Sequence, residues 1–114
     1  MTVTIWHNPR CSKSRETLAL LRARGIVPVV RLYLTDPPTL ADLRDALSRL
    51  DAPARSLVRT ADADFQALNL RPDADDETLL DLLARHPRLI ERPLVLTDRG
   101  AAIGRPPEAV LRLL

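Results

Sequence analysis

The chain opens with a strand-like run, a helix-like run and a second strand-like run, joined by short connections. Residues 2–6 alternate aliphatic residues with threonine, the period of a short β-strand. Residues 12–24 place leucines at helical spacing, and Gly25 follows where a glycine commonly ends a helix. The valine-rich run 26–32 predicts a second strand. A strand–helix–strand unit of this kind favours two parallel strands in one sheet.

The middle of the chain, residues 39–86, has no strand-like run and predicts three or four short helices. Thr39 is suited to cap the first of them, because Asp42 follows three residues later and leucines then recur at helical spacing. The further helices are expected from Pro53 toward Val58, from Asp62 to Leu68 with Phe65 and Leu68 facing inward, and from Asp75 or Asp76 through Arg85. We interpret residues 39–86 as a helical subdomain and not as a separate domain.

The last part of the chain predicts two strands and a final helix. Residues 93–97 and 101–103 have strand character, and residues 98–100 between them favour a hairpin turn. A last helix is expected to start at Pro106, with three apolar residues facing the core: Val110, Leu111 and Leu114. The whole order predicts an α/β fold and a single domain over residues 1–114. Its expected architecture is a thioredoxin-like, four-stranded mixed sheet flanked by helices, with a helical insert between the second and third strands.

Composition narrows the classes of function. A single cysteine cannot form an internal disulfide, which favours a reducing compartment, and we expect a cytoplasmic protein. No apolar run approaches the ~20 residues of a membrane span, and the N-terminus lacks a signal-peptide pattern. The 17 basic residues are scattered among 15 acidic ones with few aromatic residues, so no nucleic-acid surface is expected. One cysteine and two distant histidines do not make a metal site, and His86, at a predicted helix end, is expected to be structural.

Cys11 falls between the first strand-like run and the first helix-like run. Backbone N–H groups and the positive end of the helix dipole converge at such a position, which lowers the pKa of a thiol and also favours anion binding. Arg10, Lys13 and Arg15 add positive charge nearby. A buried core cysteine is the alternative interpretation, but these polar and basic neighbours favour a nucleophilic thiolate.

The spacing around Cys11 separates three kinds of thiol site. A dithiol redox centre needs a second cysteine three positions later, where this chain has Ser14, so any redox cycle needs an external thiol. A phosphatase loop needs an arginine six positions after the cysteine, where Thr17 stands. What remains is a single nucleophilic thiol that a hydroxyl of Ser12 or Ser14 could support. His7 is either a general base or a residue that shapes the loop, and the sequence leaves both open.

Three arginines have a local context that bears on function. Arg92 precedes Pro93, and in thioredoxin-like folds the third strand opens with a cis-proline beside the active cysteine, which places Arg92 at the site. Arg105 lies in a stiff Gly-Arg-Pro-Pro turn after the fourth strand. Arg59 ends a predicted short helix, where a solvated surface arginine is the alternative. Guanidinium groups bind pairs of oxygen atoms and therefore suit a tetrahedral oxyanion.

Four separated stretches combine these residues: residues 7–15 around Cys11, Leu57-Val58-Arg59, Glu91-Arg92-Pro93-Leu94-Val95 and Gly104-Arg105-Pro106-Pro107-Glu108. In this order they resemble the glutaredoxin-coupled arsenate reductase (ArsC-like) family of the thioredoxin superfamily, across most of the chain. The resemblance implies that Cys11 is the catalytic nucleophile and that Arg59, Arg92 and Arg105 bind the oxyanion substrate. We expect these residues to support them: His7, Ser14, Arg15 and Pro93.

The resemblance also implies an activity and its partners. Cys11 would attack arsenate, glutathione would act as co-substrate, and glutaredoxin would resolve the mixed disulfide after arsenite leaves, without any bound cofactor. Ser12 and Lys13 follow the cysteine where the best-studied loops have a glycine first. Two alternatives belong to the same superfamily, a monothiol thiol–disulfide oxidoreductase and a regulatory binding module.

Overall fold

The computed structural model describes residues 2–71 and 73–114, in which the four short strands follow one another in the predicted order and most of the helices lie between the second and third strands. Three of the helices, labelled η, are of the tighter 3-10 type. The elements are β1 (Thr4–Trp6), α1 (Ser12–Ala23), β2 (Val29–Arg31), α2 (Leu40–Arg49), η1 (Ala54–Leu57), α3 (Ala63–Ala67), α4 (Asp76–Arg85), η2 (Pro87–Leu89), β3 (Leu94–Thr97), β4 (Gly100–Ile103) and η3 (Pro107–Leu113). Within this described part of the chain, no helix has the length and apolar character needed to cross a membrane.

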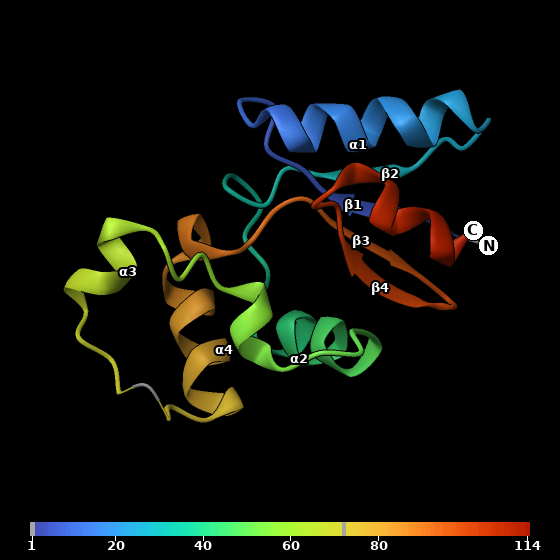
Figure 1. Ribbon diagram of the computed structural model, residues 1–114. Coiled ribbons are helices and arrows are strands. Elements are labelled where there is room, and N and C mark those ends of the chain that lie inside the picture. The colour runs from blue at the N-terminus through green and yellow to red at the C-terminus, as the bar shows by residue number, and fades with distance from the viewer. Residues whose placement is uncertain (1, 72) are drawn as a thin grey trace.

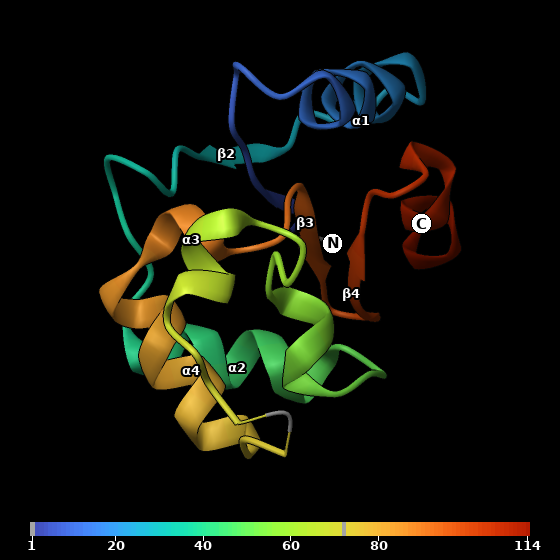
Figure 2. The same cartoon turned by 60° about the vertical axis from the view of Figure 1, so that its left-hand side comes forward.

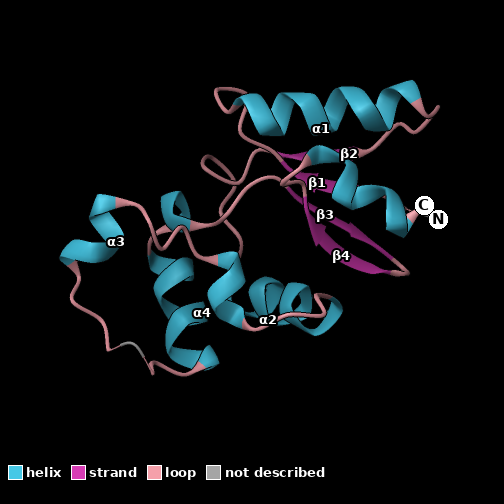
Figure 3. Cartoon of the chain, viewed as in Figure 1, coloured by secondary structure: helices cyan, strands magenta, loops and turns pink. Residues whose placement is uncertain are grey.

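The strands form one mixed sheet in the order β2-β1-β3-β4. β1 runs parallel to β2, with Ile5 beside Val30, and antiparallel to β3, with Ile5 beside Val95. β3 and β4 form the expected hairpin. Figure 3 shows the four strands between helices that lie on both sides of the sheet. The thioredoxin-like, four-stranded arrangement predicted from the sequence is therefore confirmed.

Each face of the sheet has its own core, because alternate residues of a strand point to opposite faces. Ile5 and Val95 pack with apolar residues of α1 and η3. Trp6, Leu94 and Leu96 pack with the helical segment around α2 and α4 on the other face. Figures 1 and 2 show α1 on one side of the sheet and α2 with α4 on the other.

The predicted helix ends are largely confirmed by their capping contacts. The Thr39 hydroxyl accepts the Asp42 N–H, and the Asp42 carboxylate accepts the Thr39 N–H, which is the capping box expected for α2. Asp75 caps α4 through the Thr78 N–H. Gly25 adopts φ of 77° after α1, a left-handed conformation that glycine adopts without steric cost.

Two expectations about packing are wrong. Leu68 was expected to face inward with Phe65, but α3 ends at Ala67 and the Leu68 side chain is 41% exposed. The predicted last helix is a 3-10 helix that starts at Pro107, one residue later than expected. A 3-10 helix repeats every three residues, so the buried residues are Pro107, Val110 and Leu113, while Leu111 and Leu114 are only half-buried.

Candidate active site

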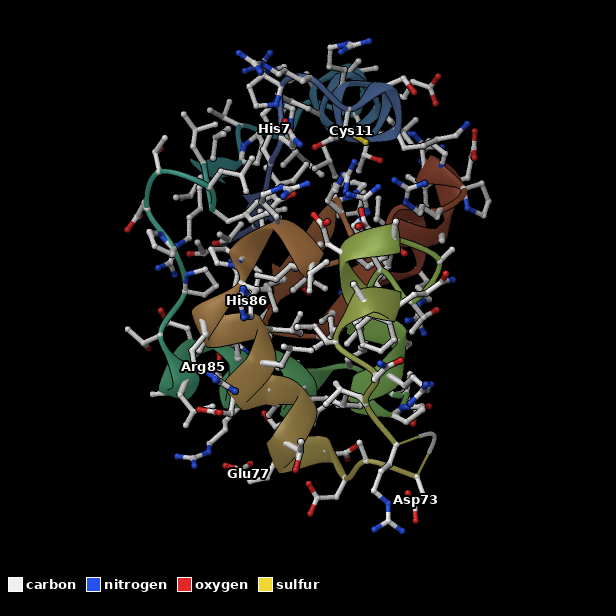
Figure 4. All side chains as sticks on the ribbon, turned by 90° about the vertical axis from the view of Figure 1, so that its left-hand side faces the viewer. His7, Cys11, Asp73, Glu77, Arg85 and His86 are labelled. Carbon is white, nitrogen blue, oxygen red and sulfur yellow. The ribbon has the colours of Figure 1, made fainter. Side chains whose placement is uncertain are left out.

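Cys11 is the N-cap residue of α1. A short loop joins it to the carboxyl end of β1. Its backbone N–H donates to the Asn8 carbonyl at 3.0 Å, and its own carbonyl accepts the Arg15 N–H at 3.0 Å. Its thiol is free, and the residue is 9% exposed. Figure 4 shows His7 and Cys11 together at the end of the molecule where α1 begins. The sequence-based placement of Cys11 at a strand-to-helix turn agrees with this geometry.

The surroundings of Cys11 favour a thiolate. Burial alone would raise the pKa of the Cys11 thiol, but the backbone N–H groups of Ser14 and Lys13 and the guanidinium of Arg92 outweigh it and hold the pKa below its ordinary value. These are the free amides of the first helical turn and one cation, the two causes expected for a helix N-terminus. At neutral pH a larger fraction of Cys11 is therefore in the thiolate form than in a free cysteine.

Ser14 supports the loop with its hydroxyl and the thiolate with its backbone. The Ser14 hydroxyl is fully buried, accepts the Asn8 N–H at 3.0 Å and lies 2.6 Å from Nδ1 of His7. Burial, followed by the charges of Arg22 and Arg15, lowers the pKa of His7, so its imidazole is neutral at pH 7. This contact engages Nδ1 of His7 with the loop and not with the sulfur, as in the loop-shaping interpretation of His7.

Arg105 reaches the sulfur from the other side of the site. Its Nη2 donates to Cys11 Sγ at 3.5 Å, and its Nε donates to the Arg92 carbonyl at 2.8 Å. Nε also lies 3.1 Å from a carboxylate oxygen of Glu91, which holds the guanidinium in place. The turn after β4 thus directs Arg105 toward Cys11, although the two residues are 94 positions apart in the chain.

Arg92 lies beside the thiol with spare hydrogen-bonding capacity. The Arg92–Pro93 peptide bond is cis, as expected for the start of the third strand, and so is Arg105–Pro106. The Pro93 carbonyl accepts the Gly104 N–H at 2.9 Å, which joins the two arginine-bearing turns. Nε of Arg92 is buried and has no hydrogen-bond partner among the described residues. A buried guanidinium N–H without a partner beside a thiolate is a donor suited to an anion.

Arg59 is brought to the same end of the sheet by a short backbone ladder. The Arg59 N–H donates to the Leu89 carbonyl at 2.8 Å, and the neighbouring Val58 and Ile90 form a β-bridge. Its guanidinium pairs with Asp62 at 3.3 Å. A hollow of about 280 Å³ joins it to Arg105; the lining residues are Arg59, Thr60, Ala61, Asp62, Glu91 and Arg105. The structure therefore brings together all three arginines named from the sequence.

Comparison with known proteins agrees with this geometry. A sequence model of the ArsC family matches residues 6–113. The chain belongs to the ArsC family. An arsenate reductase of Neisseria meningitidis serogroup A is 46% identical, over 98% of this chain and 97% of that protein. The uncharacterised Escherichia coli protein YfgD is also 46% identical, over 98% and 96%. The solved arsenate reductase of Vibrio cholerae superposes with a TM-score of 0.94 at 44% identity and covers 100% of this chain and 98% of that one.

Tyr33 is a site residue that the sequence reasoning missed in this ArsC-family chain. It is fully buried, and burial raises the pKa of its phenol, so the hydroxyl stays protonated. A hydrogen bond joins that hydroxyl to the Asn8 side chain, and the positive charges of Arg92 and Arg59 favour its ionised form. A hollow of about 60 Å³ lies against it, lined by Asn8, Tyr33, Leu34, Arg59, Arg88 and Arg92. Because Tyr33 follows a valine-rich run, its pattern resembles that of a core residue and gives no signal of a site.

The remaining candidates lie around the site or away from it. Arg15 Nη1 donates to the Pro9 carbonyl at 2.9 Å, so this side chain braces the Cys11 loop. His86 closes α4 by donating its backbone N–H to Leu82 and lies in the helical layer, away from Cys11 (Figure 4). Over residues 2–71 and 73–114, no group of three or more His, Cys, Asp or Glu side chains is arranged to hold a metal ion.

Proposed function

We propose that this protein is an arsenate reductase in which Cys11 is the attacking nucleophile. The observation that carries the proposal is the arrangement at the sulfur. A thiol with a lowered pKa lies at a helix N-terminus, and the Arg105 guanidinium is 3.5 Å from its sulfur. Arg92, which precedes the cis-proline, lowers the pKa of the same thiol. The same cations that favour the thiolate would bind a tetrahedral oxyanion against it.

The relatives support the choice of oxyanion. The Neisseria meningitidis and Vibrio cholerae proteins are named arsenate reductases, and they align with nearly the whole of this chain at 46% and 44% identity. These values are well above the level at which only a fold is shared.

In the proposed reaction, the site residues bind arsenate, attack it or hold the Cys11 loop in place. Arg59, Arg92 and Arg105 bind arsenate oxygens, and Cys11 forms a sulfur–arsenic bond as one oxygen leaves as water. A glutathione thiolate then attacks the Cys11 sulfur, arsenite leaves with the electron pair of the S–As bond, and a mixed disulfide remains on Cys11. Two thiols thus supply the two electrons that convert As(V) to As(III). Ser14, His7 and Arg15 hold the loop, and Pro93 holds Arg92 beside it.

External thiols complete the cycle. The chain has one cysteine, so it cannot resolve the mixed disulfide itself. We propose glutathione as the co-substrate and glutaredoxin as the protein that restores the Cys11 thiol. A compartment rich in reduced thiols is required for this cycle, which is consistent with a cytoplasmic location.

The proposal is tested by arsenate turnover with glutathione and glutaredoxin. Cys11→Ser should abolish turnover, and Arg92→Ala or Arg105→Ala should lower kcat/KM by a factor of about 10²–10³, as loss of an oxyanion-binding donor does in other enzymes. Full turnover by the Cys11→Ser variant would refute the proposal.

A monothiol thiol–disulfide oxidoreductase is the second candidate, because a reactive cysteine without a resolving partner also suits that chemistry. It predicts glutathione-dependent disulfide reduction that is insensitive to Arg59→Ala and to Arg105→Ala. A regulatory binding module would instead show a Cys11 pKa near that of a free thiol and a stable protein partner. Alkylation of Cys11 against pH, with and without arsenate, distinguishes these cases, since only the arsenate reductase should be protected by the oxyanion.

A further inference from the structure

The outer strand of the sheet and its flanks hold most of the exposed apolar side chains. Among the described residues, six large hydrophobic side chains are exposed, and five of them lie between residues 27 and 34. They are Val27, Val29, Val30, Leu32 and Leu34, which we call the β2 strip. β2 is an edge strand, because the strand order begins with it. Edge strands are usually protected by charged side chains, so exposed valines at an edge favour a partner that covers them.

Both faces of β2 are open. Val30 lies beside Ile5 and on the same face of the sheet, which is the face that carries α1. Figure 2 shows η3 on one side of α1, toward β4, and β2 on the other side without a helix above it in the described residues. The backbones of Val29 and Arg31 bond to β1, which leaves the Val30 N–H and carbonyl at the free edge. Pro28 has no N–H, so this edge is too short for a long added strand, and a partner would bind mainly through side chains.

The β2 strip leads to the Cys11 loop. The Arg31 carbonyl accepts the His7 N–H at 2.8 Å, which joins the end of β2 to the start of that loop. Leu34 and Asn8 line the same hollow of about 60 Å³. The Asn8 carbonyl in turn accepts the Cys11 N–H at 3.0 Å. A partner that covers the strip therefore lies next to the sulfur.

The first helix and the loop before it add positive charge beside the strip. Residues 10–24 contain one acidic residue and five basic ones, which are all exposed: Arg10, Lys13, Arg15, Arg22 and Arg24. Glu16 pairs with Lys13 at 3.4 Å, and no carboxylate of the described residues pairs with the other four. The charges of Arg15 and Arg22 act on His7, which bonds to the end of β2, so these two arginines lie on the β2 side of α1. The surface that fits here is both acidic and partly apolar.

This combination favours a protein over other occupants. A nucleic acid matches the cations but not the valines and leucines, and the three aromatic residues of the chain are buried, so no base can stack on them. A second copy of the chain would place the same cations opposite one another across a two-fold axis, and like charges repel. An acidic protein surface with apolar residues matches both the cations and the strip.

We propose that the β2 strip and the cations of α1 dock the protein thiol that restores Cys11, through an acidic and partly apolar face of that protein. The need for this thiol rests on the proposed function; the surface pattern does not. In the docked complex the partner thiolate attacks the glutathione sulfur of the mixed disulfide. A new S–S bond joins the partner to glutathione, the old S–S bond breaks, and Cys11 leaves as a thiolate.

The size of the surface suits a complex between proteins. At about 3.3 Å per residue, the β2 strip is at most about 26 Å long. A standard interface buries about 800 Å² per partner, which is a patch about 28 Å on a side. The strip with the flank of α1 beside it therefore has the dimensions of one such patch.

The experiment measures the reduction of Cys11 that carries glutathione. The mixed disulfide is first formed with glutathione disulfide, without arsenate. Its reduction is then followed by mass spectrometry, with a glutaredoxin of net negative charge and, separately, with dithiothreitol. Both reagents attack as thiolates. Dividing the glutaredoxin rate by the dithiothreitol rate therefore removes changes in the reactivity of the disulfide and leaves the contribution of docking.

Two variants of the surface are compared with matched controls. Arg22→Glu should lower the rate ratio about threefold to tenfold, and less so at high salt. Arg85→Glu should not, because Arg85 is also an exposed arginine in the last turn of a helix but lies in the helical layer, away from Cys11 (Figure 4). Leu32→Ala should lower the ratio about threefold through lost apolar contact. Leu68→Ala should leave it unchanged, although Leu68 is 41% exposed and Leu32 is 43% exposed.

Three outcomes would overturn the inference. The first is an unchanged ratio in both Arg22→Glu and Leu32→Ala. The second is an equal loss in Arg22→Glu and Arg85→Glu, which would make net charge and not this surface the cause. The third is sedimentation with phosphatidylserine vesicles that Arg22→Glu abolishes while the ratio stays unchanged, which would assign the surface to lipid. The assay contains no arsenate, so a protein that docks glutaredoxin in this way but does not reduce arsenate would refute the proposed function and leave the docking surface standing.

Discussion

At the residue scale, Arg92 has two roles: its guanidinium stabilises the Cys11 thiolate, and it offers a hydrogen-bond donor to an anionic substrate. Its guanidinium lowers the pKa of Cys11 and keeps a buried Nε without a partner among the described residues. The same group therefore activates the nucleophile before the anion arrives and is available to bind the anion afterwards. Arg105 duplicates the contact with Sγ but is held by Glu91 and by the Arg92 carbonyl. The two arginines are thus unequal, and Arg92 should have the larger effect on the thiol.

This inequality predicts a pH effect. Because Arg92 favours the charged form of Cys11, Arg92→Ala should raise the pKa of the thiol and move the pH profile of its alkylation by iodoacetamide to higher pH. At any pH below the pKa values of both proteins, each unit of increase in the pKa lowers the thiolate fraction about tenfold. Arg24→Ala removes an exposed arginine at the end of α1 and should leave the profile in place. An unshifted profile in Arg92→Ala would show that Arg92 does not stabilise the thiolate.

His7 predicts a second pH effect, on stability. Its pKa is lowered in the folded protein, so the unfolded chain, with an ordinary pKa near 6.5, binds the proton more readily. The contribution of neutral His7 to the free energy of unfolding should be complete above about pH 6.5. The free energy of unfolding should then fall as the pH drops toward the pKa of His7 in the folded protein, by at most about 1.4 kcal/mol per pH unit. Urea unfolding between pH 5 and 8 measures this slope.

One variant assigns that slope. His7→Gln should reduce it, because glutamine does not titrate. If His7→Gln kept the full slope, the protonation that destabilises the fold would lie at another group.

At the element scale, the sequence predicted what local patterns determine and missed what depends on distant contacts. The caps of Thr39 and Asp75 are local, and both were found. Leu68 has a helical spacing from Phe65, but the end of α3 at Ala67 leaves it exposed. The difference between an α-helix and the 3-10 helix η3 is likewise set by how Val110 and Leu113 pack onto the sheet, which no local pattern shows.

The same limit applied to the site. Cys11 was predicted from its helix N-terminus, and Arg92 from its proline. Tyr33 was missed because its role comes from the loop after β2 crossing beside Asn8 and Arg59, two residues far from it in the chain. The Glu91 carboxylate was missed for the same reason, since it meets Arg105 only in the folded chain.

Gly104 fixes how closely the turn after β4 approaches α1. A Cβ at this position would lie closer to the Thr17 hydroxyl than real Cβ contacts allow and 2.8 Å from Pro93 Cγ. Gly104→Ala should therefore lower the free energy of unfolding by about 1–3 kcal/mol, the usual cost of overpacking. Chemical denaturation measures it. The double variant Thr17→Ala/Gly104→Ala removes part of the collision and should lose less than the sum of the single variants. Full additivity would place the cost elsewhere than at this contact.

At the scale of the whole molecule, the two cores share their strands. β1 gives Ile5 to the core under α1 and Trp6 to the core under α2 and α4. β3 divides its residues in the same way, and the helical segment 39–86 supplies Arg59 to a site whose nucleophile caps α1, the helix on the other face of the sheet. A site assembled across two cores works only if both cores are folded at once, which favours a single cooperative unit over a domain with an attached subdomain.

This predicts that thermal unfolding is one transition. Leu21→Ala removes a fully buried side chain from the α1 core, and Leu83→Ala removes one from the α4 core. Each should lower the free energy of unfolding by about 2–5 kcal/mol. In both variants the transition seen by Trp6 fluorescence and the transition seen by far-UV circular dichroism should move together to one lower temperature. Two separable units would instead give a split transition in Leu83→Ala, in which the helical segment melts while the sheet and α1 persist. Such a partly unfolded species would keep Cys11 at its helix N-terminus but would lose Arg59 from the site. Alkylation of Cys11 would then remain fast after its protection by arsenate had disappeared.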